Sequence, residues 1–336
     1  MGKLRFNILL IISFLFVISA SSQPESNRKT IDSLESVLSN SFNTSISNKH
    51  IIELCDTLSK LYRGKNHVKT IEFAIRSLKS AEKESNINLQ ITPLGLLGEA
   101  YFRLDDYEKS ILYYSRLADI FIQQNKELEV ARTYSYLGSA HKQWSNYDLA
   151  KRYYEKSMGI CKKHQDFEGI ASCLTGIATV LTHWGDYNQA LSQYLEALKF
   201  WEEVGNSEGI AKSYNNIGML YQELGEFERA NDYYKKALLI FEDLNDNWFI
   251  VNMILHMGDI YLQTENYPKA LEYFFKALEI EKDVGNKKLK AIALSNIGEV
   301  YSKMGDFHEA LGYQNKALVL KKEDDELIKI ISGTII

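Results

Sequence analysis

The chain has 336 residues, a formal net charge of −5, 21 tyrosines and three cysteines. A negative chain attracts no phosphates, and no basic stripe alternates with aromatic residues, so nucleic acid is not expected as a partner. The odd number of cysteines excludes a disulfide framework. Cys161 and Cys173 fall in consecutive predicted helices and could approach each other; ordinary packing is the favoured interpretation and a bridge the alternative.

Residues 1–22 have the layout of a secretory signal peptide. Lys3 and Arg5 precede an apolar run over residues 6–18, and small residues come immediately before Gln23. The run is short for a membrane span, so an uncleaved anchor and a cytosolic protein are the less favoured alternatives. We therefore expect an exported protein, periplasmic or extracellular. Membrane contact would come only through an uncleaved signal or a missing C-terminal segment.

Residues 23–86 are predicted to form an N-terminal capping helix and a degenerate first repeat. Apolar residues over 31–38 have the spacing of a short amphipathic helix, and a polar stretch follows. A stack of repeats needs a polar outer face at its first unit, which this helix would supply. Over residues 48–86 the spacing of apolar residues is a weaker form of that in the later units, and His67 stands at the position of the turn aromatic.

Over residues 87–323, three columns of residues recur every 40 positions. The aromatic column reads Tyr107, Tyr147, Tyr187, Phe227, Tyr267 and Phe307. A column of small residues reads Gly98, Gly138, Ala178, Gly218, Gly258 and Gly298. The third column reads Ser110, Ala150, Ala190, Ala230, Ala270 and Ala310. Three columns locked at one period indicate an array of about six repeats, so function must be sought on the surface that the array builds.

Each repeat is predicted to be a pair of antiparallel helices. Over residues 211–244, apolar residues keep helical spacing on both sides of Gly225-Glu226. Only about two residues separate the helices, so the helices must pack as a hairpin. Glycine inside a helix costs about 1 kcal/mol relative to alanine, so its recurrence indicates close helix contact. One hairpin cannot bury its apolar face alone, which predicts an all-α solenoid of stacked hairpins.

The turns repeat as well. In pairs such as Gly185-Asp186, the first residue is predicted to end one helix and the second to cap the next. Loops between repeats, such as Gly205-Asn206 and Asn245-Asp246, follow the same design.

These units resemble the tetratricopeptide repeat, in a version about six residues longer than the commonest one. The motif reads Ile217-Gly218-x-x-Tyr221, followed by Ala230, Tyr234 and Ala237. The resemblance implies a right-handed superhelix whose concave groove, lined by the first helix of each unit, holds a protein or peptide ligand. Longer-period relatives include kinesin light chains, bacterial peptide-sensing regulators and exported bacterial sensors.

The resemblance also implies which side chains line the groove. The thirteenth position of each unit supplies Arg103, Gln143, His183, Glu223, Gln263 and Lys303. The second position supplies, among others, Arg132, Lys212 and Asn252. Asn216 and Asn296 precede a helix glycine by two residues, and their amides are predicted to bond the backbone of an extended peptide. Tolerated polar positions are the alternative interpretation.

One type of groove is not expected. The clamp that holds a chaperone's C-terminal carboxylate uses lysine at the fifth position and asparagine at the ninth. Here Ser135 and Thr175 stand at the fifth position, and Asp259 and Glu299 at the ninth would repel a carboxylate.

Residues 324–336 are predicted to be a C-terminal half-repeat or a truncated tail. By the 40-residue count, the apolar residues 327–336 lie where the next first helix would begin. Ten residues are too few to cross a bilayer as a helix. A half-unit that caps the last hairpin and a chain cut short both stay open.

No catalytic or metal-binding motif emerges. The seven histidines show no paired-ligand spacing, and no phosphate loop or nucleophile elbow is present. We therefore expect no enzyme activity, no cofactor and no metal. The favoured function is a non-catalytic scaffold that binds protein or peptide outside the cytoplasm. The alternatives are the sensor region of a histidine kinase, cyclase or helix-turn-helix regulator, and a scaffold that recruits a hydrolase to the cell envelope.

Overall fold

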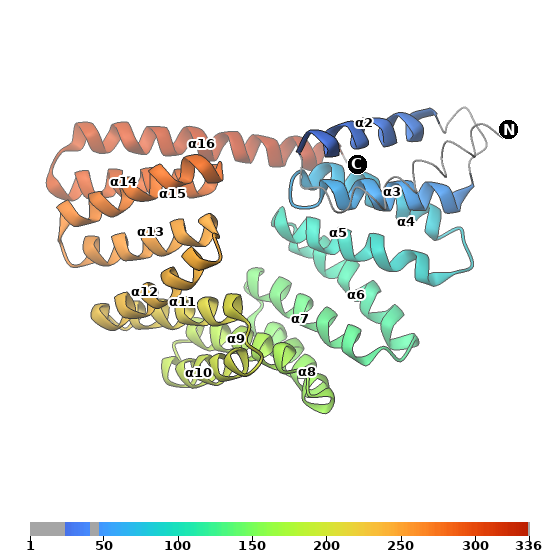
Figure 1. Cartoon of the computed structure of the whole chain (residues 1–336), viewed down its shortest axis with the longest axis horizontal. Coiled ribbons are helices and arrows are strands. Elements are labelled where there is room, and N and C mark those ends of the chain that lie inside the picture. The colour runs from blue at the N-terminus through green and yellow to red at the C-terminus, as the bar shows by residue number, and fades with distance from the viewer. Residues whose placement is uncertain (1–23, 41–46, 335–336) are drawn as a thin grey trace. The chain divides into compact units, whose positions relative to one another are not determined.

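The computed structural model describes the backbone of residues 24–40 and 47–334, and the side chains over 28–39 and 47–322. Every regular element in this part of the chain is helical, with no strand (Figure 1). The predicted all-α solenoid of stacked helix hairpins is therefore confirmed. The predicted signal peptide, residues 1–22, lies outside the described residues, as does most of the polar stretch before Asn48.

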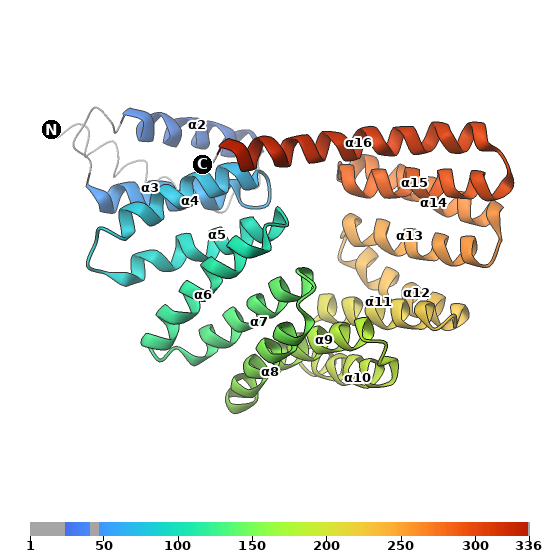
Figure 2. The ribbon, with the colours of Figure 1, turned by 180° about the vertical axis from the view of Figure 1, so that it is seen from behind.

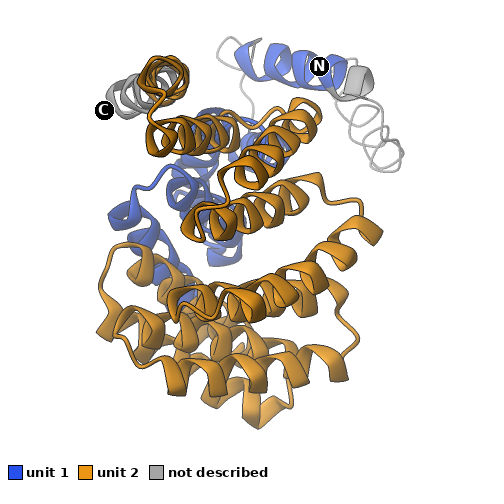
Figure 3. Cartoon of the chain, turned by 90° about the vertical axis from the view of Figure 1, so that its left-hand side faces the viewer, with its two compact units in different colours: residues 1–120 blue, residues 121–336 orange. Residues whose placement is uncertain are grey.

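The chain divides into two compact units, residues 1–120 and 121–336 (Figure 3). In the first, the elements are α2 (Pro24–Asn40), α3 (Asn48–Tyr62), α4 (His67–Ala81), η2 (Ile87–Gln90) and α5 (Ile91–Arg103). The division falls within α6 (Tyr107–Gln123). The second unit contains α7 (Glu127–Gln143), α8 (Tyr147–His164), α9 (Phe167–His183), α10 (Tyr187–Glu203), α11 (Ser207–Glu223), α12 (Phe227–Asp243), α13 (Asn247–Gln263), α14 (Tyr267–Val284), α15 (Lys287–Met304) and α16 (Phe307–Thr334).

In the first unit, α2 lies where the sequence predicts an amphipathic capping helix, and its apolar residues pack on the helices that follow. Its Leu34 and Leu38 are buried and join a small core with Leu58 of α3 and Phe73 of α4. The hairpin α3–α4 corresponds to the degenerate first repeat. Beyond it, Ser110 of α6 donates a hydrogen bond of 2.8 Å to the carbonyl of Gly98 in α5, which joins the helices of the next hairpin.

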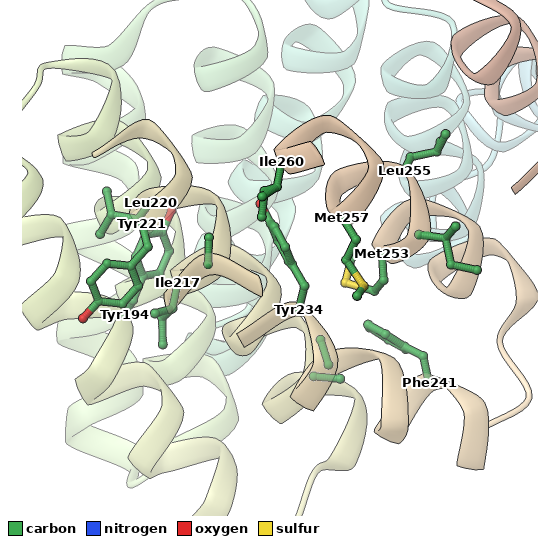
Figure 4. Close-up of a cluster of buried hydrophobic side chains, with 14 of the residues drawn as sticks. Tyr194, Ile217, Leu220, Tyr221, Tyr234, Phe241, Met253, Leu255, Met257 and Ile260 are labelled. Atoms are coloured by element: carbon green, nitrogen blue, oxygen red, sulfur yellow. The ribbon is translucent and has the colours of Figure 1, made fainter. Parts of the chain in front are cut away.

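In the second unit, five hairpins follow one another and each helix packs on the next (Figure 2). Several first helices of consecutive hairpins also contact each other: α7 contacts α9, and α13 contacts both α11 and α15. One continuous core joins these hairpins. Figure 4 shows part of it, where Phe241 of α12 lies beside Met253 of α13. The core residues come from several hairpins, so the stacking of hairpins on one another stabilises the second unit.

The helix glycines are where the two helices of a hairpin come closest. A Cβ atom on Gly258 would lie 2.5 Å from the ring of Phe274, and one on Gly218 would lie 2.7 Å from the ring of Tyr234. Gly138 faces Tyr154 in the same way. An aromatic side chain of the second helix therefore occupies the space that any larger residue would need, which confirms the prediction of close helix contact.

The turns confirm most of the predicted local chemistry. Gly185 and Gly225 have positive φ angles of 77° and 72°, so the first residue of each pair ends a helix in the left-handed region. Asp186 then accepts a hydrogen bond from the backbone of Gln189. Asn146 and Glu226 make no side-chain cap, which corrects the prediction at those two turns. There the helix starts without a side-chain acceptor for its free N–H groups.

The aromatic column packs against the core in the interior of the second unit. Tyr147, Tyr187 and Phe227 are half-buried against it, and the ring of Tyr147 stacks on His183 of the following hairpin. Phe307 differs, because 70% of its surface is exposed. Within the described residues no further hairpin follows α16 to cover this ring.

All three cysteines are free and buried. Cys161 of α8 donates a hydrogen bond of 3.8 Å to Asp166. The nearby Cys161 thiol together with burial raises the pKa of the Cys173 thiol in α9. Packing, the favoured interpretation of the sequence, describes both side chains.

The last helix extends beyond the repeat. α16 continues without a turn from Phe307 to Thr334, so residues 324–334 lengthen the last helix and do not start another one. Among the described helices, none combines the length and apolar composition that a membrane span requires.

Candidate functional site

The second unit carries two adjoining depressions on the first helices of its hairpins. One of about 400 Å³ lies over α7, α9 and α11, and one of about 220 Å³ lies over α7 and α9. Ser135, Tyr136, Ser172 and Trp201 line both, so the two form one continuous hollow, which we call the α7–α11 trough. These first helices are the ones that the resemblance to the tetratricopeptide repeat implies for the lining of a groove.

Hydroxyl groups and small residues make the floor of the trough. The hydroxyl oxygen of Ser139 lies 3.0 Å from that of Tyr154, and the hydroxyl oxygen of Thr179 lies 3.1 Å from that of Tyr194. These hydrogen bonds to tyrosines of α8 and α10 fix the positions of the two floor hydroxyls. Gly176 adds no side chain to the floor. Hydroxyls both donate and accept, so such a floor can bond either polar group of a peptide backbone.

Two aromatic side chains flank this floor. Tyr136 of α7 is half exposed. Trp201 of α10 is half-buried and lies over Gly209, where a Cβ atom would come within 2.4 Å of its ring. The absence of a side chain at Gly209 therefore allows the indole to reach the trough. Rigid aromatic groups beside hydroxyl groups are typical of surfaces that bind peptides.

The charged groups of the trough are paired, with one exception. Glu208 pairs with Lys212, and Glu168 accepts a hydrogen bond of 3.2 Å from Asn206. Arg132 pairs with Glu129, and Asp166 caps the first turn of α9 at Gly169. Lys142 is half-buried and has no ion-pair or hydrogen-bond partner among the residues whose side chains are described. Burial lowers the pKa of its ammonium group.

A second hollow of about 460 Å³, the α13–α15 pocket, is acidic. Asp259, Glu265 and Glu299 line it together with Asn296 and Lys303. The amide of Asn296 donates a hydrogen bond of 2.9 Å to Asp259. Burial, reinforced by the nearby charge of Glu299, raises the pKa of Asp259 to about 7.

The structure brings some of the predicted groove residues together and leaves others apart. Arg132 and Lys212 line the α7–α11 trough, whereas Gln263, Asn296 and Lys303 line the α13–α15 pocket. The remaining predicted residues line none of these hollows: Arg103, Gln143, His183 and Glu223, which are exposed, and Asn216 and Asn252, which are half-buried.

The predicted asparagines differ in what their amides contact. Asn252 donates to the carbonyl of Trp248 in its own helix, and Asn296 donates to Asp259. Each of these bonds uses one donor of the amide, which leaves its other N–H and its carbonyl oxygen for a further partner.

Sequence reasoning missed Lys142, Tyr136 and Trp201. Lys142 stands at the twelfth position of its unit and is the only charged residue at that position in the six repeats. Trp201 falls in a column that holds Cys161 and Phe241 in neighbouring repeats, so it resembled a core residue. The glycine at position 209, where the next repeat has Phe249, was the signal that this ring had room to reach the surface.

The buried histidines serve as packing groups. His256 stacks on Tyr234 with ring centroids 5.1 Å apart, and burial lowers its pKa to about 4. His141 stacks on Tyr153, and burial lowers its pKa as well. In the part of the chain that the structure describes, no group of three or more His, Cys, Asp or Glu side chains could hold a metal ion.

The repeat pattern and the geometry agree with a known family. A sequence profile of the tetratricopeptide repeat matches residues 89–163, 169–243 and 250–323, about two thirds of the chain. The chain belongs to the tetratricopeptide repeat family. The comparison with curated proteins found no match. Each matched span covers two of the 40-residue repeats, which places the trough and the pocket on repeat helices.

Solved structures share this fold at low sequence identity. A Rap protein complexed with competence and sporulation factor is 15% identical, with a TM-score of 0.62, and the match covers 95% of this chain and 99% of that one. The Rap conjugation regulator of plasmid pLS20, in complex with the Phr* peptide, is 17% identical with a TM-score of 0.63, covering 82% and 75%. BtubC from P. vanneervenii is 22% identical with a TM-score of 0.53, covering 66% and 91%.

Proposed function

We propose that this protein is a non-catalytic scaffold that binds an extended peptide, or an extended segment of another protein, in the α7–α11 trough. The carrying observation is the trough itself, a hollow on consecutive first helices with a hydroxyl floor and two aromatic side chains. Tyr154 and Tyr194 hold the floor hydroxyls in place before any ligand arrives. A pre-formed site loses less entropy on binding than a flexible one.

The structural neighbours support the same class of ligand. One is a Rap protein complexed with competence and sporulation factor, and another is a Rap conjugation gene regulator in complex with the Phr* peptide. Their identity to this chain is below 20%, so they share its fold and leave the identity of its ligand open. The proposal for this chain therefore stands on its own trough residues.

Filling the trough tests the proposal. A display library of random dodecapeptides is selected on the immobilised full-length protein, and enriched peptides are measured by fluorescence anisotropy. Thr175→Trp places an indole on the floor and is expected to weaken binding at least tenfold. Leu239→Trp, at a 63% exposed position on α12, is the matched control and should leave affinity unchanged. Unchanged affinity in Thr175→Trp would reject the trough as the binding site.

We further propose that the protein acts outside the cytoplasm, because residues 1–22 have the composition of a secretory signal. Expression in a bacterial host followed by cell fractionation and N-terminal sequencing tests this proposal. Export predicts a mature chain that begins near Gln23 in the periplasmic or extracellular fraction. A cytosolic chain that retains Met1 would contradict it.

A further inference from the structure

We propose that Lys142 forms an anion-binding subsite of the α7–α11 trough, which receives a carboxylate of the bound peptide beside an apolar side chain packed against Tyr136 and Trp201. This inference rests on the proposed function and adds the chemistry of the ligand to it. It concerns one residue whose side chain makes no ion pair or hydrogen bond with the described residues.

The first support is the electrostatic imbalance at Lys142. Its side chain lines the larger depression and is half-buried, with no counter-charge or acceptor among the described residues. A desolvated ammonium group without a partner is unfavourable in the free protein. Burial lowers the pKa of the Lys142 ammonium group. A bound anion would stabilise the charged form of this group and so offset the cost of its burial.

The second support is that other charges of the trough are already satisfied. Lys212 pairs with Glu208 and also lies over the ring of Phe249, at 5.1 Å from its centroid. Arg132 pairs with Glu129. A ligand anion would therefore find one free cation in the described trough, and it would find it at Lys142.

The surroundings favour a singly charged anion over a phosphate. One ammonium group balances one negative charge, and the neighbouring donors are neutral hydroxyls such as those of Ser139 and Thr179. Glu208 also lines the same depression and would repel a second negative charge. Phosphate recognition in proteins usually uses clustered arginines or helix N-termini. No arginine is among the described residues that line this depression, and the N-terminus of α11 that does line it carries the acidic side chain of Glu208.

This assignment refines the expectation drawn from the carboxylate clamp. The acidic ninth-position residues Asp259 and Glu299 line the α13–α15 pocket, whereas the ninth position in the trough holds Ser139 and Thr179. The repulsion that argued against a carboxylate ligand therefore applies to the pocket. In the trough, the lysine that would bind the carboxylate stands at the twelfth position.

The test uses peptides enriched from the random dodecapeptide library on the full-length protein. Each peptide is synthesised with its acidic residues intact or changed to Asn and Gln, and with a free or an amidated C-terminus. Affinities are measured for the natural protein, for Lys142→Met, and for Lys199→Met, an exposed lysine on α10 outside the trough.

Removing one carboxylate of the peptide is expected to weaken binding to the natural protein about tenfold or more, and to change binding to Lys142→Met less than twofold. Lys199→Met should behave as the natural protein. Whether the sensitive group is a side chain or the C-terminus identifies the source of the carboxylate. Peptides that bind in the trough equally well as acid and amide forms would overturn the inference and leave the proposed function standing. Failure to enrich any trough-binding peptide would overturn both.

Discussion

Substituting alanine for Gly258 tests the close helix contact in the repeat. A Cβ atom at this position would lie 2.5 Å from Phe274, whose ring is fully buried and cannot move outward. Overpacking of this kind costs about 1–3 kcal/mol. Gly159 is the matched control, because it also lies inside a helix and a Cβ atom there would meet nothing within 4 Å.

The two alanine substitutions are expected to change the free energy of unfolding in opposite directions. Alanine replaces glycine inside a helix with a gain of about 1 kcal/mol, so Gly159→Ala should stabilise the protein by up to that amount. Gly258→Ala has the same gain in helix propensity, but the overpacking costs about 1–3 kcal/mol, so a net loss of about 0–2 kcal/mol is expected. Urea unfolding followed by circular dichroism at 222 nm measures both. Equal stabilisation by the two substitutions would refute the account of the glycine column.

Two further predictions concern the same core and the acidic pocket. Ala230→Trp should destabilise by at least about 1–3 kcal/mol, because Ala230 is fully buried, and Leu239→Trp at an exposed site should not; equal melting curves would contradict this. Burial raises the pKa of Asp259 from 3.8 to about 7, so between these pH values the unfolded chain has lost a proton that the folded protein still holds. The natural protein therefore loses stability as pH rises from about 4 to about 7, and the loss is complete above that pH. Asp259→Asn should therefore gain stability over the natural protein as pH rises from 4 to 8, by about 1–3 kcal/mol once solvent screening is allowed for. Urea midpoints at pH 4.5 and pH 8 check this, and the same gap between the two proteins at both pH values would count against a perturbed Asp259.

The fold could be predicted from sequence because its packing repeats. Each hairpin meets the next through the same contacts, so Gly218 and Gly258 face an aromatic ring at the same place in the unit. Phe307 departs from its column because the neighbour that covers such a ring elsewhere is absent from the described chain. Periodicity predicts a residue's surroundings only where the neighbouring repeat is present.

The candidate site was less predictable, since it depends on the differences between repeats. Lys142 has no partner among the described side chains that line the trough with it, and these come from five helices, α7 to α11. The aligned columns of the repeat do not show such an arrangement. Asn296 was predicted to bind a peptide, yet its amide contacts Asp259 on the preceding first helix. Trp201 reaches the trough because of the glycine at 209, a pairing specific to one repeat.

Fluorine NMR of the protein labelled with 5-fluorotryptophan tests the central claim most directly. Of the four tryptophans, Trp201 lines the trough, while Trp144, Trp184 and Trp248 are exposed and line neither of its depressions. Addition of an enriched peptide should shift the Trp201 resonance, assigned through Trp201→Phe, and leave the other three in place. A shift confined to the other tryptophans, with Trp201 unmoved at saturation, would contradict peptide binding in the α7–α11 trough.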